Sequence, residues 1–223
     1  MVIPCFNEGD NVLTLINRIN EIFIPLDEYE VILVDNGSTD GSFEDVSFEC
    51  DRLFVHKINK NIGYGNGIKQ GLKVSTGDFI GWTHADFQTD IKDFIIASEL
   101  VTKDSFVKGR RVERKLGDKV FSFGMGIFES LLFQTSLYEI NAQPNILPKS
   151  FFEKLESIPS DFSFDLYMYY MAKLNSLKIK RFDVKFPDRV HGHSKWNTTW
   201  SSRFKFIKRT ILYSFKLRFG EKR

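Results

Sequence analysis

A short polar stretch, residues 81–90, follows an apolar run and resembles a metal-binding turn at the end of a strand. Asp86 lies at its centre, with Gln88 two residues later. A pair of carboxylates at such a position holds divalent cations, but here His84 stands where one of the two is expected. A neutral imidazole can ligate Mn²⁺, suits Mg²⁺ poorly and contributes no negative charge. The stretch is therefore a candidate metal site with an unusual second member.

A second polar cluster, residues 35–41, reads Asp-Asn-Gly-Ser-Thr-Asp-Gly and follows a nearly continuous apolar, β-branched run at 29–34. That run predicts a strand buried on both faces. A carboxylate after it can accept hydrogen bonds from a ribose or a base, while exposed amides face anionic groups. Taken alone, the cluster is more typical of an ordinary Asx turn. A third polar cluster, residues 4–8, ends another predicted strand and favours the binding role.

The elements that position these clusters alternate along the first hundred residues. Strands are expected at 2–4, 29–34, 54–57 and 78–82, and helices at 11–23 and from the glycine-rich loop to about 74. This alternation predicts an α/β fold with a mostly parallel sheet and helices on its faces. Ligands of such sheets lie at the carboxyl ends of the strands, so the three clusters can converge on one crevice.

The glycine-rich loop, residues 61–67, does not have the spacing of known phosphate loops. It lacks G-x-G-x-x-G, which disfavours a nicotinamide enzyme, and G-x-x-x-x-G-K-[ST] is absent from the chain. Gly67 and Gly71 are four residues apart and would bring the predicted helix close to the sheet.

The second half of the chain is more basic and more aromatic. Residues 107–115 are predicted to be a basic loop, 161–173 a helix and 178–184 an edge strand. Residues 120–133 are apolar nearly all round but shorter than the ~20 residues that a bilayer span needs. They predict either a buried core helix or a segment in the membrane interface.

The tail, residues 200–219, predicts an amphipathic helix, because apolar residues recur in it at spacings of three and four. From residue 195 to 223 there are nine basic residues and one acid, a net charge of +8. The first 194 residues therefore carry −6 of the overall +2. A basic aromatic tail on an acidic body favours a polyanionic partner, a membrane surface or a nucleic acid. A helix packed on the core with a solvated charged side is the alternative.

Composition limits the remaining classes of protein. The 223 residues are 42% hydrophobic and 27% charged, which fits one globular α/β domain and neither a disordered nor a polytopic membrane protein. Cys5 and Cys50 form no CxxC or Cys/His cluster, so neither a disulfide framework nor a structural zinc site is expected. The start of the chain does not resemble a secretory signal, and we expect a cytoplasmic protein.

Five motifs occur in order along the chain: Pro4-x-Phe6-Asn7-Glu8, Val34 to Gly41, Asn61-x-Gly63-x-Gly65, Ala85-Asp86-x-Gln88 and Phe186 to Lys195. Together they resemble family 2 glycosyltransferases of the GT-A fold. The last of them is similar to the R-x-x-G-x-S-K element of the polyprenyl-phosphate glycosyltransferases, which include dolichol-phosphate mannosyltransferase. The resemblance covers most of residues 1–195 and leaves 196–223 as a separate basic helix.

The resemblance implies roles for individual residues. Asp86 would bind a divalent cation, Mn²⁺ or Mg²⁺, and Gln88 would add a contact to it. His84 departs from the family's Asp-x-Asp pattern, and its roles are a direct ligand, a hydrogen-bonding neighbour of a ligand, or a phosphate contact. The nucleotide sugar would be bound by Pro4, Phe6, Glu8, Asp35 and Gly63, with Asp40 supporting the loop. Phosphate oxygens of donor or acceptor would be held by Arg110, Arg189, Ser194 and Lys195.

The reaction implied is an inverting transfer from a UDP- or GDP-sugar to an acceptor at the membrane, in cell-envelope polysaccharide or lipid-linked glycan synthesis. Arg189 and Lys195 would match charge that develops on phosphate during transfer. A polyprenyl phosphate acceptor needs no strong base, whereas a sugar hydroxyl needs one, for which Asp165 is the candidate and Asp161 the lesser one. Both aspartates are also typical of a helix start. The alternatives are a catalytically silent sugar-nucleotide binder and a nucleic-acid-binding protein, which the absence of any known motif disfavours.

Overall fold

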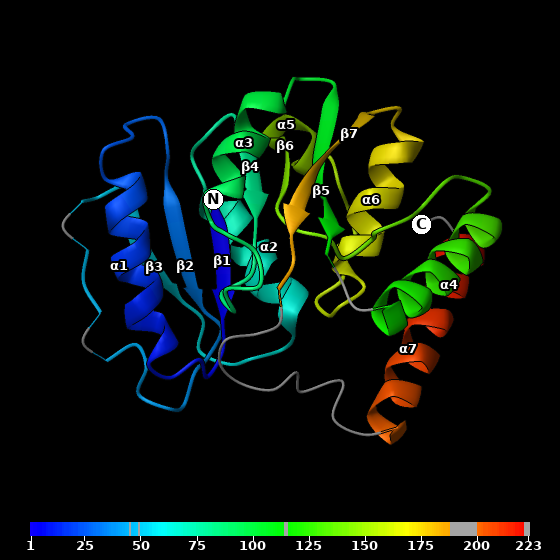
Figure 1. Ribbon diagram of the computed structural model, residues 1–223, viewed down its shortest axis with the longest axis horizontal. Helices are drawn as coiled ribbons and strands as arrows, with labels where there is room; N and C mark the ends of the chain where they lie inside the picture. Colours follow the sequence, from blue (N-terminus) through cyan, green and yellow to red (C-terminus); the bar gives the residue numbers. More distant parts are fainter. Residues whose placement is uncertain (45, 49, 114–115, 188–199, 221–223) are drawn as a thin grey trace.

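One mixed sheet of seven strands organises the chain. The computed structural model describes residues 1–44, 46–48, 50–113, 116–187 and 200–220 (Figure 1). The strand order is β3-β2-β1-β4-β6-β5-β7. The strands are β1 (Val2–Cys5), β2 (Val31–Asp35), β3 (Leu53–Lys57), β4 (Phe79–Trp82), β5 (Ser105–Val112), β6 (Asn145–Pro148) and β7 (Lys178–Lys185).

The first four strands are parallel, and the direction changes only at β6. β1 pairs in parallel with both β2 and β4, whereas β6 is antiparallel to β4 and to β5. β7 pairs in parallel with β5 at the edge of the sheet, as predicted for residues 178–184. The carboxyl ends of β1, β2 and β4 therefore open at the same edge of the sheet.

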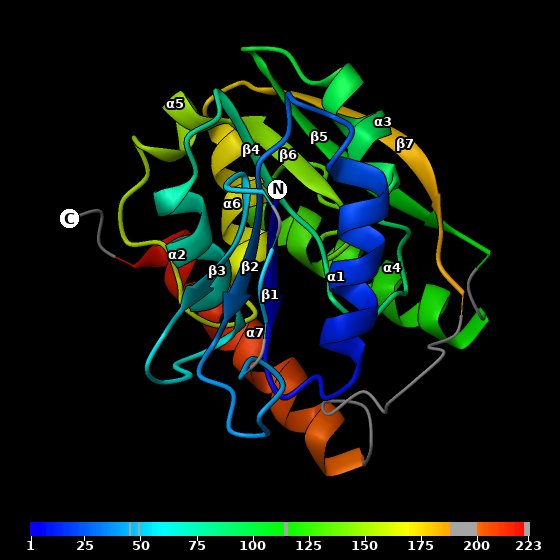
Figure 2. The ribbon, with the colours of Figure 1, turned by 90° about the vertical axis from the view of Figure 1, so that its left-hand side faces the viewer.

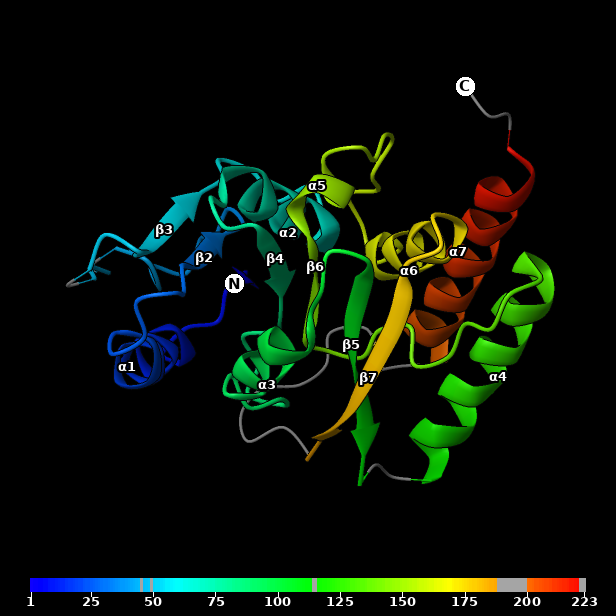
Figure 3. The ribbon, with the colours of Figure 1, turned by 90° about the horizontal axis from the view of Figure 1, so that it is seen from above.

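Helices cover both faces of the sheet (Figure 2 and Figure 3). Alternate residues of β1 point to opposite faces: Ile3 packs with α1 and α3, and Val2 packs with α2 and α6. The helices are α1 (Asn11–Phe23), α2 (Tyr64–Val74), α3 (Asp93–Leu100), α4 (Leu116–Phe133), α5 (Lys149–Phe152), α6 (Phe164–Leu174) and α7 (Trp200–Phe219). The α/β fold with helices on both faces is the one predicted.

The two C-terminal regions predicted to be helical pack on each other at one end of the molecule (Figure 1). Ser214 of α7 donates a hydrogen bond of 2.7 Å to the carboxylate of Glu129 in α4. The Nε of Arg218 donates to the carbonyl of Leu132 at 3.1 Å. Tyr213 also packs against the core on the α6 side of the sheet. The tail helix is therefore docked on the body, while the predicted domain boundary at 195 lies outside the described residues.

The prediction of a basic loop over residues 107–115 was wrong for most of its length, because residues 105–112 form β5. Lys108 is fully buried in that strand, and Arg110 and Arg111 follow it near its end. The basic side chains made this segment look like a solvated loop in the sequence. Its backbone nevertheless pairs on both sides, with β6 and with β7.

None of the described helices combines the length and the apolar character required to cross a bilayer.

Candidate active site

Backbone and side-chain hydrogen bonds join the loop after β1 to the loop after β2. Asn7 accepts a bond of 2.8 Å from the Thr39 amide through its Oδ1, and its own amide donates to Ser38 Oγ at 3.2 Å. Asp40 Oδ2 accepts from the Gly9 amide at 3.0 Å. Burial acts to raise the pKa of Asp40, but hydrogen bonds from Ser42 and Gly9 hold it below its usual range. Asp40 thus links the two loops, and its part in binding a nucleotide sugar stays a prediction.

Asp35, the last residue of β2, forms one wall of a cleft at this edge. Its Oδ1 accepts from the Ser38 amide at 2.8 Å, so the Asx turn and the cleft occur together. The side chain is 8% exposed. The cleft has a volume of about 240 Å³, and two carboxylates, hydroxyls and the ammonium of Lys57 line it. The lining residues are Asp35, Ser38, Thr39, Gly41, Ser42, Phe43, Glu44 and Lys57.

The three residues predicted from the first motif stand at the end of β1, which pairs with β2, and they are not among the residues that line this cleft. Pro4 is opposite Val34 in the paired strands, one residue before Asp35. Phe6 and Glu8 follow β1 and are half-buried.

Gly63 lies where its own loop meets the loops that contain Asn36 and Ser160. Its φ of +131° is unfavourable for a side chain, and an added Cβ would lie 2.3 Å from the carbonyl of Ser160. Its carbonyl accepts from Asn36 Nδ2 at 3.1 Å. Gly71 has the packing role predicted for it, since a Cβ there would lie 2.4 Å from Val2 Cγ1. Gly71 thus allows α2 to lie close to the sheet, and Gly63 allows the loop before α2 to lie close to Ser160.

The candidate metal loop begins where β4 ends. Asp86 Oδ1 accepts from the Gln88 amide at 3.2 Å across a turn in which Phe87 has φ +56°. The ring of His84 stacks on Tyr64, with centroids 5.6 Å apart and planes inclined by 29°. The Nε2 of Gln88 donates to the carbonyl of Pro187 at 3.5 Å. Pro187 is the last described residue before Arg189, and Arg189, Ser194 and Lys195 lie outside the described residues.

The side chains of this loop fit a divalent ion only in part. No group of three or more His, Cys, Asp or Glu residues is placed to hold a metal within the described parts of the chain. One carboxylate with an imidazole or an amide fits an ion that takes its other ligands from a bound diphosphate. His84 and Asp86 suit that arrangement and do not suit a site built from protein alone.

Asp165 lies beneath the same loop, in the first turn of α6. It is 3% exposed, and its Oδ1 accepts from Trp82 Nε1 at 3.0 Å and from Gln143 Nε2 at 3.2 Å. Burial raises the pKa of Asp165, while the nearby Lys108 and His84 act to lower it. Burial and the charges of Asp165 and Asp86 raise the pKa of the Tyr64 phenol. The electrostatic coupling links both aspartates to one aromatic side chain.

Two other residues predicted for the site, Asp161 and Arg110, lie further from its centre. Asp161 Oδ1 accepts from the Ser163 amide at 2.9 Å, a capping bond before α6, which begins at Phe164 rather than at 161. Arg110 forms an ion pair of 2.5 Å with Asp183 across β5 and β7, where both side chains are about half exposed.

Four buried side chains around Asp165 were not predicted: Trp82, Lys108, Gln143 and Asn145. They come from three different strand regions, and only the pairing of β6 with β4 and β5 brings them together. Polar residues among apolar neighbours, as at Lys108, were the only signal in the sequence.

The family model described as "Glycosyl transferase family 2" matches residues 1–153. The chain belongs to this family. The predicted family 2 glycosyltransferase is thereby confirmed, and the match spans β1 to α5, which includes the Asp35 cleft and the Asp86 loop.

Curated relatives of this family 2 glycosyltransferase carry dodecaprenyl phosphate or undecaprenyl phosphate in their names. The dodecaprenyl-phosphate galacturonate synthase of Rhizobium johnstonii is 25% identical over 229 residues, covering 98% of this chain and 67% of the relative. The undecaprenyl-phosphate 4-deoxy-4-formamido-L-arabinose transferase of Aeromonas hydrophila is 34% identical over 93 residues. That match covers 40% of this chain and 28% of the relative, so this chain spans only part of either relative's length.

Solved glycosyltransferases share the fold. Glucosyl-3-phosphoglycerate synthase from Mycobacterium tuberculosis, in complex with Mn²⁺, UDP and glucosyl-3-phosphoglycerate, has a TM-score of 0.71 at 15% identity. The match covers 100% of this chain and 80% of that one. Mannosyltransferase PcManGT from Pyrobaculum calidifontis, in complex with GDP-Man and Mn²⁺, has a TM-score of 0.67 at 15% identity and covers 100% and 64%. The predicted GT-A fold is confirmed.

Proposed function

We propose that this family 2 glycosyltransferase transfers a sugar, with inversion, from a nucleoside diphosphate sugar to a polyprenyl phosphate at a membrane. The observation that carries the proposal is the convergence of the Asp35 cleft and the Asp86 loop at the carboxyl ends of β2 and β4, which flank β1. A donor that spans them would have its nucleoside in the cleft and its diphosphate at Asp86. The named activities of the curated relatives support the acceptor class.

The donor site follows from the groups that line it. The Asp35 carboxylate is suited to accept hydrogen bonds from a ribose or a base, since it lies at the wall of the cleft. Pro4, Phe6 and Glu8, at the end of the neighbouring strand β1, are proposed to complete the donor site. Lys57, in the same cleft, supplies a positive charge.

Asp86 would hold a divalent cation, with Gln88 and His84 beside it, and such an ion supplies Lewis-acid stabilisation of the leaving diphosphate. The Mn²⁺ complexes of similarly folded glycosyltransferases support this assignment. This chain's own contribution is to hold the Asp86 turn rigid through the bond from the Gln88 amide.

The acceptor side is assigned to the segment that follows Pro187. Because the Pro187 carbonyl lies within hydrogen-bonding distance of Gln88, the chain enters residues 188–195 next to the metal loop. Arg189, Ser194 and Lys195 are thus proposed to bind phosphate oxygens. A phosphate acceptor is already an anionic nucleophile, so no strong base is required of Asp165 in this reaction. With a sugar hydroxyl as acceptor, Asp165 takes the proton.

An exposed apolar surface on α4 and α7 supports action at a membrane. Three residues of α4 share one helical face, Phe123, Ile127 and Leu131, with exposed fractions of 70%, 46% and 74%. Leu212, Phe215 and Phe219 of α7 are exposed as well. We call these six residues the α4–α7 apolar surface.

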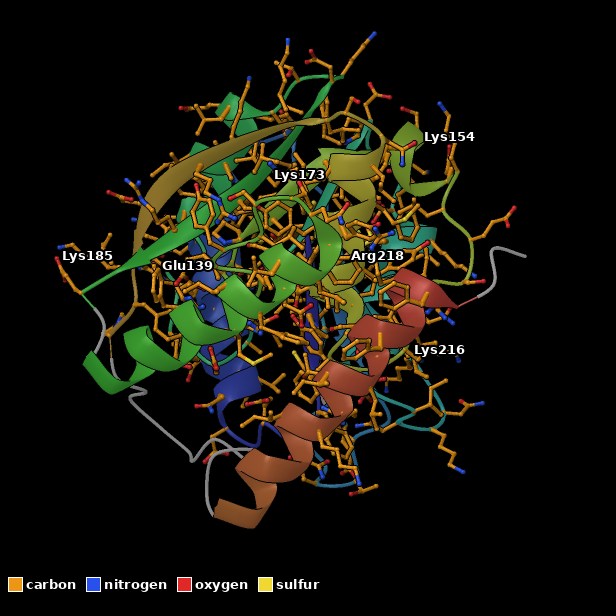
Figure 4. All side chains as sticks on the ribbon, turned by 90° about the vertical axis from the view of Figure 1, so that its right-hand side faces the viewer. Glu139, Lys154, Lys173, Lys185, Lys216 and Arg218 are labelled. Atoms are coloured by element: carbon orange, nitrogen blue, oxygen red, sulfur yellow. The ribbon has the colours of Figure 1, made fainter. Side chains whose placement is uncertain are left out.

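Basic side chains accompany this surface. Lys216 and Arg218 lie on α7 near its end (Figure 4), and Lys208 and Arg209 precede them. Each Lys or Arg near an anionic surface contributes roughly 1 kcal/mol to binding. We propose peripheral attachment on the cytoplasmic face through this surface, and no nucleic-acid partner.

One observation favours a second function, a catalytically silent sugar-nucleotide binder. His84 replaces a carboxylate, and its ring packs on Tyr64. Such a protein would bind the donor without turning it over.

The decisive experiment is transfer from radiolabelled UDP- and GDP-sugars to undecaprenyl phosphate in the presence of Mn²⁺. Formation of a labelled lipid supports the proposal. Donor binding without labelled product, with either the lipid or a soluble glycan acceptor, supports the silent binder. The absence of donor binding would reject both functions.

A further inference from the structure

A line of buried polar side chains runs from β5 to the active site. Lys108 and Asn145 are fully buried, Gln143 is 1% exposed and Asp165 is 3% exposed. The ammonium of Lys108 donates to Asn145 Oδ1 and, at 3.0 Å, to the carbonyl of Ile140. Both of these acceptors are neutral, which is costly for a buried cation unless a negative charge lies further along.

The hydrogen bonds beyond Asn145 lead to such a charge. Asn145 Nδ2 donates to Gln143 Oε1 at 2.5 Å, and Gln143 Nε2 donates to Asp165 Oδ1 at 3.2 Å. Gln143 Nε2 also lies 3.2 Å from the Tyr64 hydroxyl, the ring that stacks on His84. Two amides thus connect a buried ammonium to a buried carboxylate.

Only one orientation of the two amides satisfies this line. An ammonium cannot accept a hydrogen bond, so Asn145 must turn its oxygen to Lys108 and its nitrogen to Gln143. Gln143 must then turn its oxygen to Asn145 and its nitrogen to Asp165. A donor pointing at Asp165 stabilises the ionised carboxylate, as does the second donor from Trp82.

We propose that Lys108 is a positioning residue of the transferase, which acts through Asn145 and Gln143 to hold Asp165 ionised and oriented beside His84 and Tyr64. The role in transfer rests on the proposed function, but the coupling of Lys108 to Asp165 does not. Lys108 does not contact the substrate.

The charged groups around Lys108 and Asp165 determine in which direction the removal of Lys108 shifts the pKa of Asp165. Burial lowers the pKa of Lys108 to about 7, and the positive charges of Arg181 and Arg111 act in the same direction. Asp165 and Glu139 act to raise it. Burial raises the pKa of Asp165, which lies next to the Tyr64 phenol, and the charges of Lys108 and His84 act to lower it. Removing Lys108 should therefore raise the pKa of Asp165.

The test is a titration of the Asp165 carboxyl by ¹³C NMR of protein labelled at aspartate Cγ, with the resonance assigned by its loss in Asp165→Asn. In Lys108→Met the midpoint should move to higher pH by about one unit, a tenfold change in proton affinity. Gln143→Leu breaks the line at another link and should give a shift in the same direction. If Lys108→Met does not fold, the midpoint in Gln143→Leu tests the proposal.

The control is Lys149→Met, which also removes a lysine that donates to a backbone carbonyl, that of Ser75 at 2.7 Å. An unchanged midpoint in Lys108→Met and Gln143→Leu, or an equal shift in Lys149→Met, would overturn the proposal. The titration needs no turnover, so an inactive wild type would reject the proposed function and leave this test intact. In enzyme that is active with a sugar hydroxyl acceptor, for which Asp165 takes the proton, the acid limb of the kcat profile should move with the midpoint while the donor KM stays constant.

Discussion

Glu129 should make the stability of the protein depend on pH, and Glu129→Gln should remove that dependence. The residue is fully buried in α4, where Ser214 of α7 donates to its Oε1 at 2.7 Å and its Oε2 has no hydrogen-bond partner among the described residues. Burial raises the pKa of Glu129 from 4.5 to about 7, although the bond from Ser214 opposes the rise. The folded state therefore holds this proton over a pH range in which the unfolded chain has lost it.

The sign of the pH dependence follows from this difference in protonation between the folded and the unfolded state. The stabilisation is fully present below the unfolded pKa and is lost as pH rises to the folded pKa near 7. At 1.36 kcal/mol per pKa unit, the folded protein should lose at most about 3 kcal/mol between pH 4.5 and 7.5 through this residue. Glutamine is neutral at both values and can still accept from Ser214. Glu129→Gln should thus be nearly neutral at pH 5 and stabilising by up to about 3 kcal/mol at pH 8.

Thermal unfolding at pH 5 and pH 8 checks this prediction. For a chain of this size the gain at pH 8 corresponds to an increase in Tm of roughly 6 to 12 °C at most. Glu28→Gln is the matched control, since Glu28 is exposed in the turn after α1 and should give no pH-dependent difference. An equal change in Tm at both pH values in Glu129→Gln would refute the reasoning, because the effect would then not be one of ionisation.

Three further predictions follow from the site and its surroundings. His84→Asp should preserve or increase Mg²⁺-supported transfer, because a carboxylate suits this ion better than imidazole, and a loss of that activity would remove residue 84 from the metal. Gly63→Ala should destabilise the fold by more than about 1 kcal/mol in urea unfolding, through backbone strain and the clash with Ser160, whereas Gly124→Ala, at an open position, should not. Phe123→Ser combined with Leu131→Ser should reduce pelleting with anionic liposomes. Unchanged pelleting would exclude α4 from membrane contact.

The parallel half of the fold could be predicted because its signals are local. A buried run followed by a turn cluster marked β2, and helical spacing over 11–23 marked α1, whose bounds agree with the structure. β5 could not be recognised, since Lys108 is a buried cation whose compensation comes from Asn145 and Gln143, more than thirty residues later. The sequence pattern of β5 alone is typical of a solvated loop.

The positions of candidate site residues could be predicted where a single short motif follows a predicted strand. Asp35 and Asp86 stand at strand ends, and a turn follows each of them in the sequence. The surroundings of Asp165 were not predictable, because Trp82 and Gln143 reach it from strands that pair only in the folded sheet. The exposure of the apolar face of α4 likewise depends on where α7 docks.

The most direct test of the central claim is calorimetric titration of the wild type and Asp86→Ala with UDP- and GDP-sugars, each with and without Mn²⁺. One donor should bind the wild type at least tenfold more tightly with Mn²⁺ than without it, a difference of about 1.4 kcal/mol. Asp86→Ala should lose that difference while keeping its fold by circular dichroism. Equal metal dependence in Asp86→Ala, or no binding of any donor to the wild type, would contradict a metal-assisted nucleotide-sugar site at the ends of β2 and β4.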